Sequence, residues 1–356
     1  MRIGIPKEIK PLEGRVALVP DAAGDVVRRG HSVLLQAGAG LASGYTDADY
    51  QRQGVDILPD AAAVYGQGEL LLKVKEPIAA EFPLLRREHR LFSFLHLAAE
   101  PALAAVLQAK GLTAIAFETV QQAGRLPLLA PMSDIAGRIA VQVGATLLHS
   151  PAGGRGILLG GLPAAPRGRV GVLGAGEAGG NAAAMAAALG AEVLVFDLAL
   201  SALTRMRALG PNVTGLHAYP SAIAEAVREA DLLIGAVLIP GARAPRLVTR
   251  AMVRSMRPGS VVVDIAVDQG GCIETTRATN YAAPTYVEEG VIHFTVTNMP
   301  GAVPRTASQA LSAALTPFVL RLAEADWRDD PALAAGLNID AGRVVHAQVA
   351  LALKGA

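Results

Sequence analysis

A glycine-rich turn in the middle of the chain limits its fold more than any other feature. The apolar segment VGVL (170–173) is followed by GAGEAG and then by an alanine-rich segment that extends to about Leu189. In this G-x-G-x-x-G pattern Gly174 permits a tight turn, Gly176 lets a pyrophosphate approach the backbone, and Gly179 lets a helix pack closely on the strand. A helix that begins here presents free N–H groups and the positive end of its dipole to phosphate. The pattern therefore predicts a strand, a phosphate-binding turn and a helix.

An acidic residue ends the next predicted strand, 192–196 (EVLVF), at Asp197. An acid about twenty residues into such a unit accepts hydrogen bonds from the adenosine ribose hydroxyls of a dinucleotide. The same carboxylate would repel a 2′-phosphate, and Leu198 follows it where an NADP enzyme often has a cation. The sequence therefore predicts NAD rather than NADP. The alternative for Asp197 is a solvated cap at the end of a strand.

The composition is that of a large globular protein. The chain has 356 residues, enough for two domains of ordinary size, and 52% of them are hydrophobic and 18% charged. A net charge of +1 gives no basic excess for a nucleic-acid partner. No apolar segment is as long as a membrane span, and MRIGIPKEIK lacks the apolar core of a signal peptide. Because Cys272 is the only cysteine, an intrachain disulfide is impossible, and we expect a cytoplasmic protein.

Short apolar segments alternate with helical patterns along the chain, which predicts parallel sheets covered by helices. In the first part, strands are expected at 2–5, 32–36, 70–74, 91–95 and 113–117, and helices at 21–29, with Asp21 as N-cap, and 101–110. Later elements are expected as a helix at 133–149, strands at 231–236, 260–265 and 292–297, a helix from Thr306 or Ser308, and a short helix at 342–353. Roughly the last fifty residues are expected to return to the N-terminal domain.

Arg15 lies in a loop after the first predicted strand. An arginine in this position can clamp a carboxylate through two parallel hydrogen bonds. The alternative is a surface arginine paired with Glu8 or Glu13, and the local sequence does not distinguish the two.

Ionisable groups also end two other predicted strands. Lys73 and Lys75 follow the apolar residues LLL, and period-two alternation would point both to one face. The end of a parallel strand is where ligands bind, although a lysine there can also be merely solvated. His96 ends the segment FSFLH, and an imidazole can carry protons near neutral pH. Its alternative is a histidine packed in the core.

Polar residues follow two strands of the second half. Asp264 and Asp268 come after VVV, and Asn298 stands where a strand gives way to a Pro-Gly turn. Asp268 could face a ligand crevice and Asn298 a nicotinamide, whereas the alternative for all three is a turn-forming role. The histidines are scattered without ligand spacing, so no metal site is expected.

Stretches distributed along the whole chain form a pattern that is highly specific when taken together. They are GIPKEIKPLEGRVALVP, LLLKVKEPIAAE, FLHLAAEP, LLAPMSDIAGRIAVQVGA, GGRGILLGG, GVLGAGEAGGNAA, LLIGAVLIPGARAPRLV, VVVDIAVDQGGCIETTR and PTYVEEGVIHFTVTNMPGAVPRTAS. By these stretches the chain resembles the alanine dehydrogenase family over essentially its full length.

The resemblance implies an α/β fold of two Rossmann-like, doubly wound domains, the N-terminal one discontinuous. It implies a substrate-binding domain at 1–128, completed by 306–356, and an NAD-binding domain at 129–305. It also implies NAD as the cofactor and a homohexamer as the usual assembly.

The family's functional residues fall on matching positions of this chain. The resemblance implies that Arg15 and Lys75 hold the substrate carboxylate and oxo group, that His96 is the acid/base, and that Asp268 assists at the reacting carbon. The implied cofactor contacts are Ser133, Gly174, Gly176, Gly179, Asp197, Val237, Leu238, Ile265, Asn298 and Met299.

Several positions depart from the family's pattern. Phe94 stands where many relatives have tyrosine, and Glu177 lies in the glycine turn where an uncharged residue is common. Asn280 and Tyr281 replace the usual Thr-His pattern. These departures bear on affinity more than on the reaction.

The reaction that the resemblance implies is the reversible, NAD-dependent oxidative deamination of L-alanine to pyruvate and ammonium. One alternative is the NAD-binding, hydride-transferring subunit of nicotinamide nucleotide transhydrogenase, which shares the architecture but couples to membrane segments that this sequence lacks. Another is a non-catalytic NAD-binding regulator. The sequence does not determine whether serine, glycine or other small oxo acids are also substrates.

Overall fold

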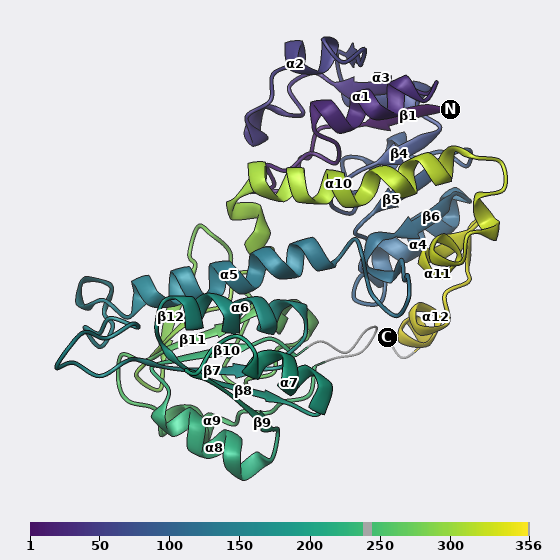
Figure 1. Ribbon diagram of the computed structural model, residues 1–356. Coiled ribbons are helices and arrows are strands. Elements are labelled where there is room, and N and C mark those ends of the chain that lie inside the picture. Colours follow the sequence, from purple (N-terminus) through teal and green to yellow (C-terminus); the bar gives the residue numbers. More distant parts are fainter. Residues whose placement is uncertain (238–243, 355–356) are drawn as a thin grey trace. The chain divides into compact units, whose positions relative to one another are not determined.

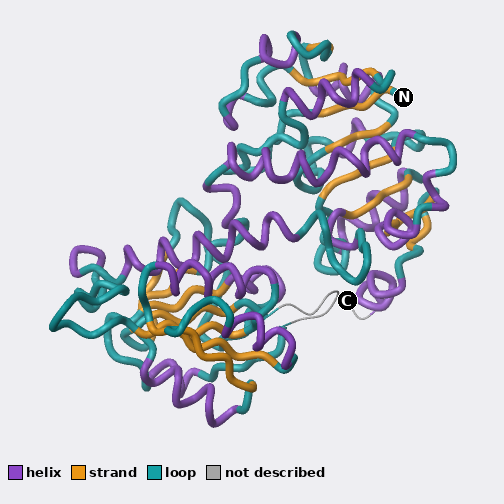
Figure 2. The backbone as a smooth tube through the Cα atoms, viewed as in Figure 1, coloured by secondary structure: helices purple, strands orange, loops and turns teal. Residues whose placement is uncertain are grey.

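Two compact units make up the chain (Figure 1). The computed structural model describes residues 1–237 and 244–354, without the side chains of 268 and 269. One unit combines Met1–Met132 with Gly301–Ala356, and the other is Ser133–Pro300. Each unit contains a sheet flanked by helices, as the strands and helices of Figure 2 show.

The first unit is built on an eight-stranded sheet with the order β15-β14-β6-β5-β4-β1-β2-β3. The strands are β1 (Arg2–Ile5), β2 (Ser32–Gln36), β3 (Asp56–Leu58), β4 (Leu70–Leu72), β5 (Arg90–Ser93), β6 (Thr113–Ala116), β14 (Leu337–Asp340) and β15 (Arg343–Val344). Strands β1 to β6 pair in parallel, while β14 pairs antiparallel with both β6 and β15. The chain adds β2 and β3 on one side of β1 and then β4 to β6 on the other, which is a doubly wound order.

The helices of this unit are short except for one near the C-terminus. They are α1 (Pro20–Arg28), α2 (Asp47–Gln51), α3 (Ala61–Gln67), α4 (Pro101–Lys110), α10 (Pro304–Ala323), α11 (Pro331–Gly336) and α12 (Ala347–Lys354), and α5 (Ala130–Leu147) contains the boundary to the second unit. The 3₁₀ helices of the chain are η1 (Leu41–Ser43), η2 (Phe82–Leu84), η3 (Phe117–Thr119), η4 (Ser150–Ala152), η5 (Ile265–Gln269), η6 (Met299–Ala302) and η7 (Trp327–Asp329).

Helix α10 joins the C-terminal segment to the N-terminal part of the first unit. The Ser308 hydroxyl accepts a hydrogen bond from the backbone N–H of Val16 at 2.9 Å, and the Ser312 hydroxyl accepts one from Val19 at 2.9 Å. These two serines lie one helical turn apart on the buried face of α10. The unit is therefore discontinuous in sequence.

The second unit repeats the order of the six parallel strands of the first. Its sheet runs β12-β13-β11-β10-β7-β8-β9. The strands are β7 (Arg169–Leu173), β8 (Glu192–Asp197), β9 (Val213–His217), β10 (Leu232–Gly235), β11 (Val261–Asp264), β12 (Thr285–Glu288) and β13 (Val291–Phe294), and the helices are α6 (Glu177–Ala188), α7 (Leu200–Arg207), α8 (Pro220–Glu229) and α9 (Arg250–Arg254). All neighbours are parallel except β12 and β13. The predicted α/β class with two Rossmann-like, doubly wound domains is confirmed.

Aliphatic residues make up most of both cores, in agreement with the low aromatic content. In each unit, apolar strand residues pack against the apolar faces of helices, with Leu71, Leu91 and Leu107 in the first cluster and Leu233, Val262 and Val227 in the second. Within the described residues, no helix is both long enough and apolar enough to cross a membrane.

Two local expectations were wrong. Helix α1 begins at Pro20 with Val19 as N-cap, rather than after Asp21, because the fixed φ of proline suits the first helical position. The segment expected as a helix from 342 first forms β15, and α12 begins at Ala347. Pairing with β14 at the edge of the sheet overrides the local helical pattern there.

Candidate active site

The glycine turn between β7 and α6 has the geometry that its sequence predicts. Gly174 has a φ of +96°, which is in the left-handed region. A Cβ atom on Gly179 would lie 1.8 Å from the carbonyl oxygen of Gly174, so any side chain there would separate the helix from the turn. A Cβ atom on Gly176 would meet no atom of the protein within 4 Å. The backbone at Gly176 is thus open to a ligand at the start of α6, and the turn fits a dinucleotide pyrophosphate.

Asp197 ends β8 beside this turn. Its Oδ2 accepts a hydrogen bond from the backbone N–H of Ala175 at 2.7 Å, and its Oδ1 accepts one from Ala199 at 2.8 Å. The carboxylate is therefore held against the glycine turn and is more than a solvated strand end. Because each carboxylate oxygen can accept a further bond, both remain suited to ribose hydroxyls.

Four other predicted cofactor contacts of the second unit follow strands of its sheet. Val237 follows β10, Ile265 follows β11 and opens η5, and Asn298 and Met299 follow β13. Because β13, β11, β10 and β7 are consecutive parallel strands, their carboxyl ends meet at one edge, which is where doubly wound sheets bind ligands. Ser133 lies in α5. Leu238 lies outside the described residues.

Asp197→Ala is expected to weaken NAD use and to admit NADP, because the variant loses both the ribose acceptor and the repulsive charge. Hydrogen bonds to a charged group contribute about 1.5–3 kcal/mol, so the KM for NAD should rise roughly tenfold or more. Initial rates with each dinucleotide measure the change. Glu192→Ala, an exposed acid at the other end of β8, is the control. An unchanged preference in Asp197→Ala would show that this carboxylate does not contact the ribose.

Arg15 is buried in the first unit, with 2% of its surface exposed. Its Nε donates to Glu13 Oε1 at 2.7 Å and its Nη2 donates to Glu13 Oε2 at 2.5 Å. Nη1 lies 3.1 Å from the sulfur of Met132. The pairing with Glu13 was one of the two alternatives, but the surface position assumed with it was wrong. Glu13 holds the guanidinium in a fixed plane.

The two lysines after β4 have different environments. Strand β4 ends at Leu72, so the expected alternation does not extend to them. The Lys73 ammonium is buried and contacts two carboxylates, Glu8 at 3.1 Å and Glu81 at 2.8 Å. Burial alone would lower the pKa of Lys73, but its ion pairs with Glu8 and Glu81 outweigh burial and raise this pKa. Lys73 is therefore structural, neither ligand-binding nor solvated.

Lys75 remains the candidate for substrate binding on this loop. The backbone N–H groups of Val74 and Lys75 both donate to Oε1 of Glu8, at 2.7 and 3.3 Å. Glu8 thus binds both the Lys73 ammonium and the backbone of the loop that contains Lys75. These contacts limit the movement of this loop.

Lys73→Met is expected to lower the free energy of unfolding by about 3–5 kcal/mol, because the variant leaves the buried carboxylates of Glu8 and Glu81 without a cation. Urea denaturation of the purified variant measures the loss. Arg28→Met is the matched control, since Arg28 and Asp25 form an exposed ion pair whose loss should have little effect. Wild-type stability in Lys73→Met would show that the two buried carboxyl groups do not require the lysine.

His96 follows β5 in an unusual backbone conformation, with a φ of +49°. Its ring stacks on Phe94, with centroids 5.9 Å apart and planes within 5° of each other. The side chain of His96 is 38% exposed, so it is not the packed core histidine of the alternative interpretation. Its backbone N–H donates to Glu118 at 2.6 Å.

In the second unit, Asp264 is a structural residue that closes a loop. Its carboxylate accepts hydrogen bonds from the backbone of Ala266 and Cys272 and from the hydroxyl of Thr276, at 3.0, 3.1 and 2.7 Å. Burial raises the pKa of Asp264. Both ends of the loop that contains η5 are therefore hydrogen-bonded to Asp264. Asp268 lies in η5.

Arg15, Lys75 and His96 follow β1, β4 and β5, which are parallel neighbours in the first sheet. The three residues therefore lie beyond the same carboxyl edge, at the switch point between β1 and β4.

The sequence analysis did not identify Glu118, and it gave Glu8 and Glu13 no positioning role. Their acidic character was visible, but the backbone and side-chain partners that define these roles were not.

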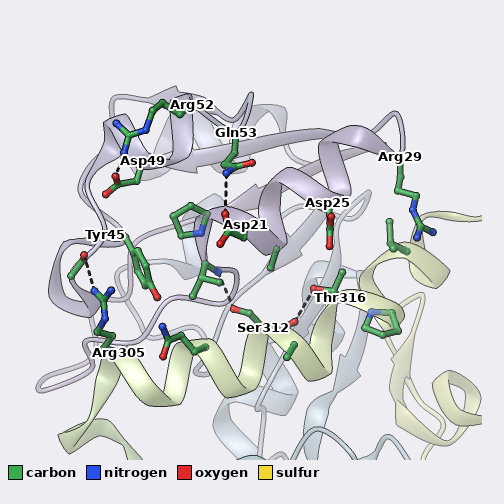
Figure 3. A pocket seen from close by; sticks show the side chains of 18 of the residues that line it. Asp21, Asp25, Arg29, Tyr45, Asp49, Arg52, Gln53, Arg305, Ser312 and Thr316 are labelled. Carbon is green, nitrogen blue, oxygen red and sulfur yellow. Dashed lines mark hydrogen bonds and ion pairs between the residues drawn. The ribbon is translucent and has the colours of Figure 1, made fainter.

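A polar hollow elsewhere in the first unit contains none of these residues. It lies between α1 and α10 (Figure 3). Several of its charged groups have partners within the unit: Arg52 pairs with Asp49, and Arg305 donates to the carbonyl of Gly44 at 3.1 Å. Among the described residues, no cluster of His, Cys, Asp and Glu could hold a metal ion.

The glycine turn, the acid after it and the doubled topology define a dinucleotide-binding α/β protein with a second domain of the same topology. Family models for alanine dehydrogenase/PNT match residues 4–136 with the N-terminal domain and residues 140–347 with the C-terminal domain. The alanine dehydrogenase of Halomonas elongata is 50% identical, over 98% of this chain and 96% of the relative. The chain therefore belongs to the alanine dehydrogenase/PNT family.

Solved structures agree with this assignment. An L-alanine dehydrogenase superposes with a TM-score of 0.95 and 48% identity, covering 100% of this chain and 99% of the other. A transhydrogenase from Sinorhizobium meliloti superposes with a TM-score of 0.84 and 30% identity, covering 98% of this chain and 99% of the other. NAD is accordingly the cofactor of this chain, and the glycine turn described above fits it.

Proposed function

We propose that this NAD-dependent dehydrogenase interconverts L-alanine with pyruvate and ammonium. The observation that carries the proposal is the placement of Arg15, Lys75 and His96 beyond one edge of the first sheet, where two cations and a proton carrier suit an amino acid. Identity of 50% to an alanine dehydrogenase over nearly the whole chain supports it.

Substrate binding is the proposed role of Arg15 and Lys75. The guanidinium of Arg15, oriented by Glu13, would pair with the substrate carboxylate, and the Lys75 ammonium would hold the carboxylate and the oxo group of pyruvate. Fixing these groups also fixes the direction in which the substrate Cα–H bond points.

Proton transfer is the proposed role of His96. In the deamination direction the amine nitrogen must lose a proton as the imine forms, and water must lose one as it attacks the imine carbon. His96 would take these protons, release one to solvent and return the other to the departing nitrogen, and Asp268 would assist at the reacting carbon. NAD supplies the redox chemistry, since it accepts the hydride of Cα. Alanine, water and NAD⁺ thus give pyruvate, ammonium, NADH and a proton.

The two units would divide this work. We assign substrate binding to residues 1–128 with 306–356, and NAD binding to residues 129–305. Within the latter, Ser133, Val237, Leu238, Ile265, Asn298 and Met299 would contact the cofactor together with the glycine turn and Asp197. We further propose a homohexamer, a cytoplasmic location and a role in L-alanine catabolism.

A spectrophotometric assay at 340 nm, where NADH absorbs, tests the proposal. NADH should form with L-alanine, and it should be consumed with pyruvate only when ammonium is present. A panel of serine, glycine and small oxo acids then defines the breadth. A chain that binds NADH but oxidises no amino acid would instead support the transhydrogenase-type alternative, which its 30% identity to that relative makes the weaker one.

A further inference from the structure

A carboxylate that sequence reasoning did not identify lies against the proposed proton carrier. Strands β5 and β6 are parallel neighbours, with Ser93 paired to Ala116, so the residues after β6 lie beside those after β5. The first turn after β6 is η3, which carries Glu118. Glu118 therefore reaches the loop of His96 from a neighbouring strand end.

The contacts of Glu118 converge on His96. Its Oε1 accepts the backbone N–H of His96 at 2.6 Å, and its Oε2 accepts that of Leu95 at 3.2 Å. Oε1 also lies 3.9 Å from Nδ1 of the His96 ring, which is close but longer than a hydrogen bond. The side chain of Glu118 is only 15% exposed, so solvent screens this interaction less than it would on the surface.

These bonds explain how His96 keeps its left-handed backbone. A non-glycine residue with a φ of +49° is unfavourable unless its surroundings hold it there. The successive backbone N–H groups of Leu95 and His96 both donate to the carboxylate of Glu118. This arrangement stabilises both the negative charge of Glu118 and the backbone turn at His96.

The ring of His96 is oriented from two sides. Phe94 stacks on its face, and Phe117, the residue before Glu118, packs edge-on against Phe94 with centroids 5.0 Å apart. The Nδ1 edge faces Glu118. A carboxylate beside one imidazole nitrogen favours the proton on that nitrogen, which leaves Nε2 as the proton acceptor.

We propose that Glu118 is a positioning residue that holds the backbone and the ring tautomer of His96 for proton transfer. The proposal rests on the proposed function of His96. Glu118 itself touches neither substrate nor cofactor in this proposal, and it acts only through the histidine.

Glu118→Gln is the direct test, because glutamine keeps an acceptor oxygen for the backbone but has no charge. We expect kcat for L-alanine to fall roughly 10–100-fold, as when the group that orients a functional imidazole is removed. The KM for L-alanine and the dissociation constant of NADH should change little. Glu100→Gln, an exposed acid on the segment that follows His96, should retain wild-type rates.

A double-mutant cycle separates positioning from mere structural support. In the His96→Ala background, Glu118→Gln should cause no further loss of the residual rate, because the group that it positions is gone. An equal loss in both backgrounds, or a wild-type kcat in Glu118→Gln, would overturn the inference. An inactive wild-type chain would overturn the proposed function and this inference with it, whereas an active wild type beside an unaffected variant would overturn this inference alone.

Discussion

Replacing His96 by alanine is expected to lower turnover of L-alanine by about 10²–10⁴-fold, the usual contribution of a positioned proton-transfer group. The side chain is partly exposed, and its ring stacks on Phe94 and lies close to Glu118. Its removal should therefore leave no large cavity, and the melting temperature should change little.

Melting temperature and turnover measured on the same preparation decide between catalysis and packing. His149→Ala, which removes an exposed histidine of the other unit, is the control and should retain the wild-type rate. A folded His96→Ala variant with the wild-type rate would end the acid/base assignment.

Arg15→Ala and Lys75→Ala are each expected to lower kcat/KM for L-alanine roughly 10²-fold or more, while NADH still binds. A hydrogen bond to a charged group contributes about 1.5–3 kcal/mol, and an arginine–carboxylate clamp makes two of them. Steady-state kinetics give the loss, and fluorescence titration with NADH gives cofactor affinity.

Arg15→Ala also removes the guanidinium that donates to the buried carboxylate of Glu13, so a conservative variant is needed. Arg15→Lys keeps a cation beside Glu13 but cannot donate two parallel bonds, and its KM for L-alanine should still rise. Lys7→Ala removes an exposed lysine of the loop after β1 and should have no effect. Wild-type kcat/KM in Arg15→Lys and Lys75→Ala would leave both residues with only structural roles.

Much of the fold could be predicted from local patterns. The strands at 2–5 and 32–36 and the helix at 101–110 agree with the structure residue for residue. These are apolar segments with clear ends, for which local preference and tertiary burial agree. Short, half-polar elements such as β3 and β9 were missed, because pairing with a neighbouring strand stabilises them more than their own sequence does.

The candidate site could be predicted only in part. Arg15, Lys75 and His96 were found because ionisable groups at strand ends stand out against apolar sequence. Lys73 also follows an apolar strand, yet it is buried in an ion pair with Glu8 and Glu81. Glu8 lies 65 positions before Lys73 in the sequence. No spacing rule relates them, since the contact depends on where separate loops meet.

The glycine turn, its strand and its helix could be predicted from the sequence, because each requirement there is met by residues within a few positions of one another. The alternation of strands and helices likewise predicted parallel sheets covered by helices. Which charged groups are buried, and which groups pair with them, depends on the tertiary structure. Glu118 approaches His96 because β5 and β6 are parallel neighbours, and Glu8 approaches Lys73, 65 residues further along the chain, because β1 and β4 are parallel neighbours. Such contacts arise from the three-dimensional path of the backbone, and that path is set by the packing of the whole domain.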